Sequence, residues 1–156
     1  MHKSTSVTKY IPSAITSGNL ICGFTAIMIG DFYWSPILLL GSFIFDSLDG
    51  LAARALNAQS EFGKQMDSLA DVISFGVAPA YLYSLYSPDF ENKFFTIATC
   101  SMIVIAGTIR LAKFNITPSL PYFLVLPIPA NALFYIGVIM GIENESQSFI
   151  DFFSSK

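Results

Sequence analysis

Long apolar segments separated by short polar connections dominate the pattern of this chain. Five segments are each mainly apolar and approach or reach the length of a membrane-spanning helix: 11–30, the segment from 36 into the aspartate-containing stretch, 62–86, 94–111 and 122–141. Tyr33 and Trp34 stand in the first connection, as is typical of the headgroup region of a membrane. The pattern predicts an all-α, polytopic transmembrane helix bundle of about five spans.

Prolines and polar tails refine this prediction. Pro36 suits the first turn of the second helix, whereas Pro79 stands inside the third apolar segment and predicts a kink or local break there. Residues 1–10 are polar and basic, and we expect them to form a cytoplasmic tail without a cleavable signal peptide. Residues 11–141 then form one transmembrane domain, and residues 142–156 form a polar to amphipathic tail.

Composition and charge support a membrane protein. The chain is 53% hydrophobic and only 12% charged, whereas a soluble domain carries about 25% charged residues. The sequence has no basic patch of the kind that binds nucleic acid, so we expect no nucleic-acid partner.

The distribution of lysine and arginine predicts the orientation in the membrane. With five spans and a cytoplasmic N-terminus, six of the eight basic residues fall on the cytoplasmic side. They are Lys3, Lys9, Arg54, Lys64, Arg110 and Lys113, against Lys93 and Lys156 on the other side. We therefore expect an integral protein of the cytoplasmic membrane.

Four aspartates form the candidate functional site. Asp46 and Asp49 share one face of the second helix, and Asp67 and Asp71 share one face of the third. The polar segment 56–61 is short enough for a tight turn, so the helices should run antiparallel and bring the pairs to similar depth. Four convergent carboxylates between apolar segments require neutralising cations, and hard divalent metals prefer oxygen ligands. The site would open toward the cytoplasm.

This arrangement predicts phosphate chemistry. A pair of divalent ions can bridge phosphate oxygens in an in-line displacement. Arg54 falls near the same face of the second helix and is suited to binding phosphate through two oxygens at once, although an arginine that reaches the lipid headgroups is an alternative. Gly50 and Gly63 leave space for a ligand, or for tight helix packing. Asn19 and Ser74 could contribute polar contacts to the site or helix-packing hydrogen bonds.

The spacing of these residues resembles the signature of the CDP-alcohol phosphotransferase family. Eight positions over 26 residues match it: Asp46, Asp49, Gly50, Ala53, Arg54, Gly63, Asp67 and Asp71. The flanking segments SGNLICGF, DSLADVISFGVAPA, RLAKFN and LPIPANA resemble the CDP-diacylglycerol–serine O-phosphatidyltransferase branch. The family usually has six or more spans.

The resemblance implies a reaction and a set of roles. Asp46, Asp49 and Asp67 would bind two divalent cations, Mg²⁺ or Mn²⁺, and Asp71 would complete the site as general base. The CDP pocket would be lined by Gly50, Ala53, Arg54 and Gly63. The hydroxyl of L-serine would attack CDP-diacylglycerol among membrane lipids, forming phosphatidylserine and releasing CMP. We also expect a homodimer.

The serine carboxylate would need a cation, and Arg110 and Lys113 are the candidates, with anchoring at the cytoplasmic surface as the alternative. Three other functions stay open. The acceptor could be glycerol phosphate or an inositol phosphate, which would call for more basic residues near Arg110. The carboxylates could belong to a divalent-cation transporter, although the outward halves of the second and third spans are almost wholly apolar. An inactive partner of a longer copy is the third alternative.

Overall fold

The fold is known from a computed structural model that describes residues 10–86, 93–116 and Gly137. Apart from Gly137, the predicted fifth span at 122–141 lies outside these residues, as do the tail at 142–156 and nearly all of the N-terminal tail. The described elements are α1 (Ile11–Ile29), α2 (Trp34–Ala55), α3 (Glu61–Asp71), the π-helical segment η2 (Val72–Val77), α4 (Ala78–Tyr86) and α5 (Lys93–Ile116).

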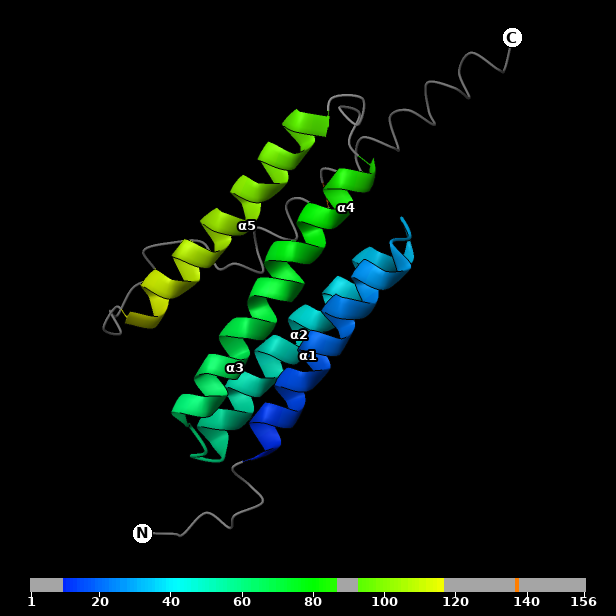
Figure 1. The fold of residues 1–156 in the computed structure, drawn as a ribbon. Coiled ribbons are helices and arrows are strands. Elements are labelled where there is room, and N and C mark those ends of the chain that lie inside the picture. The colour runs from blue at the N-terminus through cyan, green and yellow to red at the C-terminus, as the bar shows by residue number, and fades with distance from the viewer. Residues whose placement is uncertain (1–9, 87–92, 117–136, 138–156) are drawn as a thin grey trace.

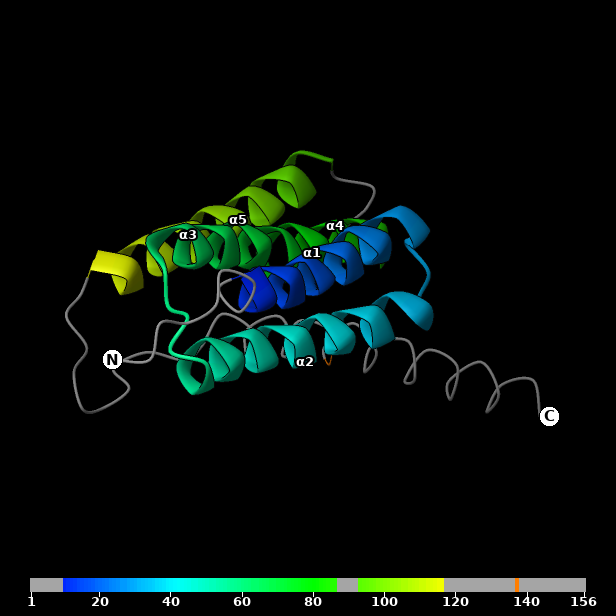
Figure 2. The same ribbon diagram turned by 90° about the horizontal axis from the view of Figure 1, so that it is seen from below.

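The helices run alternately up and down, and α3, η2 and α4 follow one another as a single long helix (Figure 1). Helix α1 lies between α2 on one side and the α3–η2–α4 helix on the other (Figure 2). Helix α5 packs on the opposite side of that long helix, against η2 and α4. The start of α1, the α2–α3 connection and the end of α5 therefore lie at one end of the bundle.

Four of the described helical stretches are long and apolar enough to cross a membrane: Ile11–Ile29, Trp34–Ala55, Glu61–Tyr86 and Lys93–Lys113. These stretches confirm the first four predicted spans. Helix α5 continues five residues past the predicted end at Leu111, to Ile116. The protein is therefore an integral membrane protein, and the elements that the structure describes are all helical.

Large apolar side chains face outward from this bundle, and small or polar side chains face inward. Ile21, Phe24 and Met28 on α1 are more than half exposed, whereas Ala26 is fully buried. On α2 the hydroxyl of Ser35 donates to the carbonyl oxygen of Ala26 over 2.9 Å. Small residues let transmembrane helices approach closely, and hydroxyl groups then bond across the interface. The outward face suits lipid.

The connection between α2 and α3 is a compact turn, and backbone or side-chain hydrogen bonds stabilise it at both ends. Asn57 has a positive φ of 50°, and the N–H of Ala58 bonds to the carbonyl of Ala53, which is the Schellman ending of a helix. The hydroxyl of Ser60 accepts a hydrogen bond from the N–H of Gly63 and caps α3. The turn reverses the chain within a few residues, as the short polar segment predicts.

The local break expected at Pro79 is the π-helical segment η2, which ends two residues before it. The N–H of Ala78 bonds to the carbonyl of Ile73, five residues earlier, instead of to that of Ser74. Proline has no N–H to donate and its ring clashes with the carbonyl four residues before it, so a wider turn relieves the strain. Asp71 lies immediately before this widened turn, at the end of α3.

Candidate functional site

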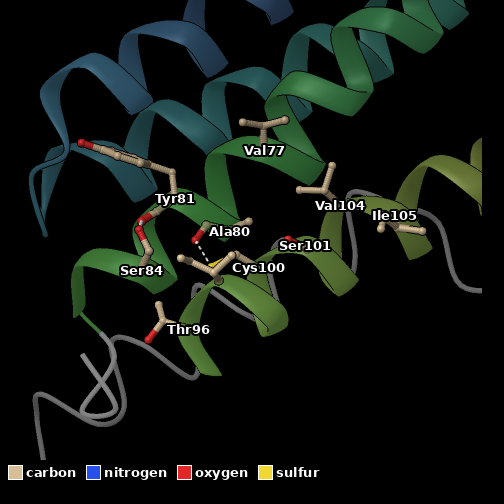
Figure 3. A pocket seen from close by; sticks show the side chains of 10 residues that line it. Val77, Ala80, Tyr81, Ser84, Thr96, Cys100, Ser101, Val104 and Ile105 are labelled. Carbon is tan, nitrogen blue, oxygen red and sulfur yellow. Dashed lines mark hydrogen bonds between the residues drawn. The ribbon is translucent and has the colours of Figure 1, made fainter. Parts of the chain in front are cut away.

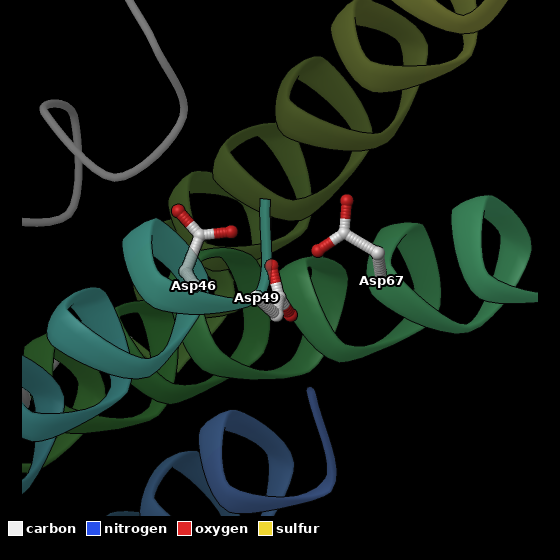
Figure 4. Close-up of side chains that lie close together, drawn as sticks. All are labelled: Asp46, Asp49 and Asp67. Atoms are coloured by element: carbon white, nitrogen blue, oxygen red, sulfur yellow. The ribbon is translucent and has the colours of Figure 1, made fainter. Parts of the chain in front are cut away.

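Three of the four predicted aspartates come together between α2 and α3. Carboxylate oxygens of Asp46, Asp49 and Asp67 all lie within 4.8 Å of one another. Asp46 and Asp49 extend from α2, and Asp67 extends toward them from α3 (Figure 4). The predicted convergence of the two helices is confirmed for these three residues, which we call the aspartate triad.

The triad fits a divalent cation in its chemistry. One side-chain oxygen of Asp67, Oδ1, is buried and has no hydrogen-bond partner in the part of the chain that the structure describes. A buried carboxylate oxygen without a donor is costly unless a cation neutralises it. Three carboxylates from two helices supply the hard oxygen ligands that Mg²⁺ and Mn²⁺ prefer. The residues present therefore suit a divalent metal ion.

Asp71 does not belong to this close group. Its side chain is buried one helical turn beyond Asp67, where it lies against the carboxyl group of Asp46. Its Oδ1 atom also accepts a hydrogen bond of 3.3 Å from the side-chain amide of Asn19. Asp71 is thus next to the triad without sharing its tight geometry, so its surroundings differ from those of the other three carboxylates.

Helix α1 supplies two polar partners to the aspartates, one of which, Thr16, the sequence pattern did not assign. The hydroxyl of Thr16 donates to Oδ2 of Asp49 over 2.6 Å, and it was not singled out at all. For Asn19 the structure supports both open alternatives, because its amide reaches Asp71 while its backbone carbonyl accepts a bond from Ser74. A hydroxyl and an amide three residues apart in an apolar span were the signal that could have found this pair.

The predicted CDP-binding residues lie along the end of α2 and the start of α3. A Cβ atom at Gly50 would be 3.9 Å from Nη2 of Arg54, so the guanidinium folds back along α2 toward the turn that carries Asp49. Arg54 itself is exposed and forms no ion pair with any residue in 10–86 or 93–116. Ala53 is half-buried beside it, and Gly63 lies against the capping hydroxyl of Ser60.

The predicted acceptor residues lie on α5. Arg110 is half-buried, next to Leu111, which packs against Phe75 of η2. Within the described chain Arg110 has no ion pair with the triad, and Lys113 is exposed in the last turn of α5. Their role in binding an acceptor stays a prediction.

Hydrogen bonds between α3 and α5 were not predicted from the sequence. The ammonium group of Lys64 donates to the backbone carbonyl of Asn115 over 2.9 Å, and the amide of Asn115 donates to the hydroxyl of Ser68 over 2.7 Å. These bonds fix the end of α5 beside the residue that follows Asp67. Lys64 therefore links the start of α3 to the end of α5.

A hollow of about 550 Å³ lies apart from the aspartates, between α4 and α5 (Figure 3). It is lined mainly by apolar and hydroxyl-bearing side chains, among them Val77, Tyr81, Ser84, Ser101 and Val104. The thiol of Cys100 faces it and bonds to the carbonyl of Ala80 over 3.1 Å. Among the described residues that line it, none is acidic or basic.

Comparison with known proteins gives several relatives. The chain is 42% identical to a CDP-diacylglycerol–serine O-phosphatidyltransferase of Bacillus subtilis, over 77% of this chain and 70% of that protein. It is 44% identical to a protein of the same name from Methanocaldococcus jannaschii, over 81% of this chain and 59% of that one. An archaetidylserine synthase of Methanothermobacter thermautotrophicus is 38% identical over 85% of this chain and 60% of its own length. The chain thus spans about 60% of the length of two of these relatives.

The family model for CDP-alcohol phosphatidyltransferases matches residues 9–153. This match includes both pairs of aspartates and every described helix. All eight positions of the signature also lie within the matched range. The chain belongs to the CDP-alcohol phosphatidyltransferase family.

Proposed function

We propose that this protein transfers the phosphatidyl group of CDP-diacylglycerol to the hydroxyl of L-serine, forming phosphatidylserine and releasing CMP. The aspartate triad, with its buried and unpartnered Oδ1 of Asp67, is the observation that carries the proposal. The acceptor is inferred from the names of the relatives in Bacillus subtilis and Methanocaldococcus jannaschii.

Two divalent cations, Mg²⁺ or Mn²⁺, would be held by Asp46, Asp49 and Asp67, with Asp71 completing the set. Bound there, the cations would neutralise the negative charge of the diphosphate and of the departing CMP. Arg54, exposed and free of ion pairs within the described residues, would bind a phosphate oxygen pair with its planar guanidinium. Gly50, Ala53 and Gly63 would leave room for the nucleotide beside it.

The chemical step forms one bond and breaks one. The serine oxygen attacks the phosphorus atom that carries the diacylglycerol, and the bond from that phosphorus to the oxygen of CMP breaks. Asp71 accepts the proton of the serine hydroxyl, a role that suits a carboxylate beside the triad but outside its tightest group. Arg110 and Lys113 would bind the serine carboxylate from α5.

The proposal also sets the orientation. The acidic site lies at the same end of the bundle as Arg54, Lys64, Arg110 and Lys113. Basic residues favour the cytoplasmic side, so the site would face the cytoplasm from the cytoplasmic membrane. Soluble serine and the CMP product would then exchange with the cytoplasm.

Cross-linking of the purified protein in detergent tests the expected homodimer.

The test measures CMP release from membranes that contain the full chain. CDP-diacylglycerol is supplied with Mn²⁺ or Mg²⁺ and with serine, glycerol 3-phosphate or inositol phosphate in separate reactions. We expect release that depends on serine and on the cation, and that falls at least 100-fold in Asp71→Asn because the proton acceptor is lost.

Asp31→Asn is the matched control. Asp31 accepts hydrogen bonds from the N–H groups of Tyr33 and Trp34 at the other end of α2, and asparagine preserves such a cap. Its activity should equal that of the unsubstituted protein. Release with glycerol 3-phosphate but not serine would move the protein to another branch of the family. Cation uptake into vesicles without CMP release would instead support a transporter.

A further inference from the structure

Two side chains of α1 contact carboxylates that belong to other helices. Helix α1 carries no acidic residue of its own. Thr16 donates to Asp49 of α2, and Asn19 donates to Asp71 of α3. Thr16 and Asn19 are three residues apart and share one helical face, so a single face of α1 holds a carboxylate from each of its two neighbours.

The bond from Thr16 to Asp49 is the shorter of the two that its hydroxyl can form. The oxygen atoms are 2.6 Å apart, whereas the carbonyl oxygen of Pro12 on the same helix is 3.0 Å away. A separation of about 2.5–2.7 Å is typical of a hydroxyl that donates to a charged carboxylate. Asp49 is therefore the closer of the two acceptors for this hydroxyl.

The position of this face is fixed by further contacts around Asn19. The side chain of Asn19 is fully buried, and its backbone carbonyl accepts bonds from Ser42 over 2.7 Å and from Ser74 over 3.2 Å. Gly23, one turn later, has no side chain that would cover this carbonyl or exclude Ser74. Helices α1 and α2 and segment η2 thus meet at Asn19. These contacts hold its side-chain amide toward Asp71.

We propose that Thr16 and Asn19 are positioning residues for the active-site carboxylates. Thr16 donates to Oδ2 of Asp49 and Asn19 donates to Oδ1 of Asp71, so each bond restricts the orientation of one carboxylate. This inference rests on the proposed metal-dependent function. Partners of this kind restrict the orientation of a metal ligand, and their removal typically weakens metal affinity about 10- to 100-fold.

The first test measures Mn²⁺ binding, without substrate, by electron paramagnetic resonance of the purified full chain in detergent. Thr16→Val keeps the shape of the side chain and removes the donor, and we expect affinity to fall about 10- to 100-fold. Thr16→Ser keeps the hydroxyl and should restore binding to within about threefold of the unsubstituted protein. Thr25→Val is the matched control, because the hydroxyl of Thr25 is bonded only to Ile21 of its own helix.

The second test separates positioning from packing at Asn19. Asn19→Leu has a similar volume but no donor to Asp71, so we expect kcat to fall about 10- to 100-fold while KM for CDP-diacylglycerol changes little. Ser35→Ala is the packing control, because it removes a comparable bond from α2 to the backbone of α1, at Ala26 and away from the carboxylates. If Ser35→Ala lowers kcat as much as Asn19→Leu, the role of Asn19 is packing alone.

The outcomes separate the two proposals. No Mn²⁺ binding by the unsubstituted protein would overturn the metal-dependent function itself. Normal binding by both the unsubstituted protein and Thr16→Val would overturn only the positioning role. If Thr16→Val does not fold, the smaller Thr16→Ala replaces it, and the same loss of affinity is required of that variant.

Discussion

Gly23 of α1 is the position where one added methyl group should disturb the site most. A Cβ atom there would lie 2.2 Å from Oγ, 2.7 Å from Cβ and 2.8 Å from Cα of Ser74. Carbon atoms in good contact are about 3.5–4.0 Å apart, so α1 and η2 would have to separate by roughly 1 Å. Overpacking of this kind costs about 1–3 kcal/mol of unfolding free energy.

Thermal unfolding of Gly23→Ala in detergent measures this cost, and we expect the melting temperature to fall by several degrees. Activity should fall too, because the shift removes the bond between Ser74 and the carbonyl of Asn19. Gly107→Ala on α5 is the control. The structure describes no neighbour within 4 Å of that added Cβ, so the variant should be as stable as the parent or slightly more so.

A double variant tests the reasoning behind this prediction. Adding Ser74→Ala to Gly23→Ala removes Oγ, but Cβ and the backbone Cα atom still lie within 2.8 Å of the new methyl group. We therefore expect no recovery of stability. Full recovery in the double variant, or an unchanged melting temperature in Gly23→Ala alone, would refute the claim that backbone contact at Gly23 sets the spacing of α1 and η2.

Two further substitutions test the triad and the turn that positions it. Asp67→Asn should abolish tight Mn²⁺ binding yet raise the melting temperature in chelator. The reason is that unit charges at the upper limit of 4.8 Å repel by about 3.5 kcal/mol at an effective dielectric constant of about 20. A lower melting temperature in chelator would contradict this. At Asn57, whose φ is 50°, alanine should lower the unfolding free energy by about 1 kcal/mol and glycine should not. Chemical or thermal unfolding compares the two variants, and equal loss in both would argue against backbone strain.

The positions of the described helices could be predicted from the sequence. The length of each apolar segment, and the glycines, prolines and polar residues that bound it, determine them locally. Segment 11–30 became α1, ending where Gly30 adopts a φ of 56°. Pro36 stands in the first turn of α2, and the polar segment 56–61 forms the turn that follows. The widening at η2 was predictable only as a break near Pro79, because the choice between a kink and a π-helical turn depends on the neighbours that pack around it.

The site was predictable to the level of helical faces. Spacing places Asp46 with Asp49 and Asp67 with Asp71, and the turn makes the two faces approach. Spacing does not reveal that Asp71 lies outside the triad or that Lys64 bonds to the end of α5. Those contacts join residues that are distant in sequence, and side-chain packing decides which of many possible pairs form.

The sequence by itself determined the membrane-spanning character, the antiparallel pair of acidic helices and the family, since each depends on local composition or fixed spacing. Only the tertiary structure decided what surrounds the carboxylates. Thr16 and Asn19 look like ordinary polar residues in an apolar span, and they reach Asp49 and Asp71 because small residues such as Gly23 let the helices approach closely. Periodicity fixes the face on which a side chain lies, but the distance between helices fixes what that side chain can touch.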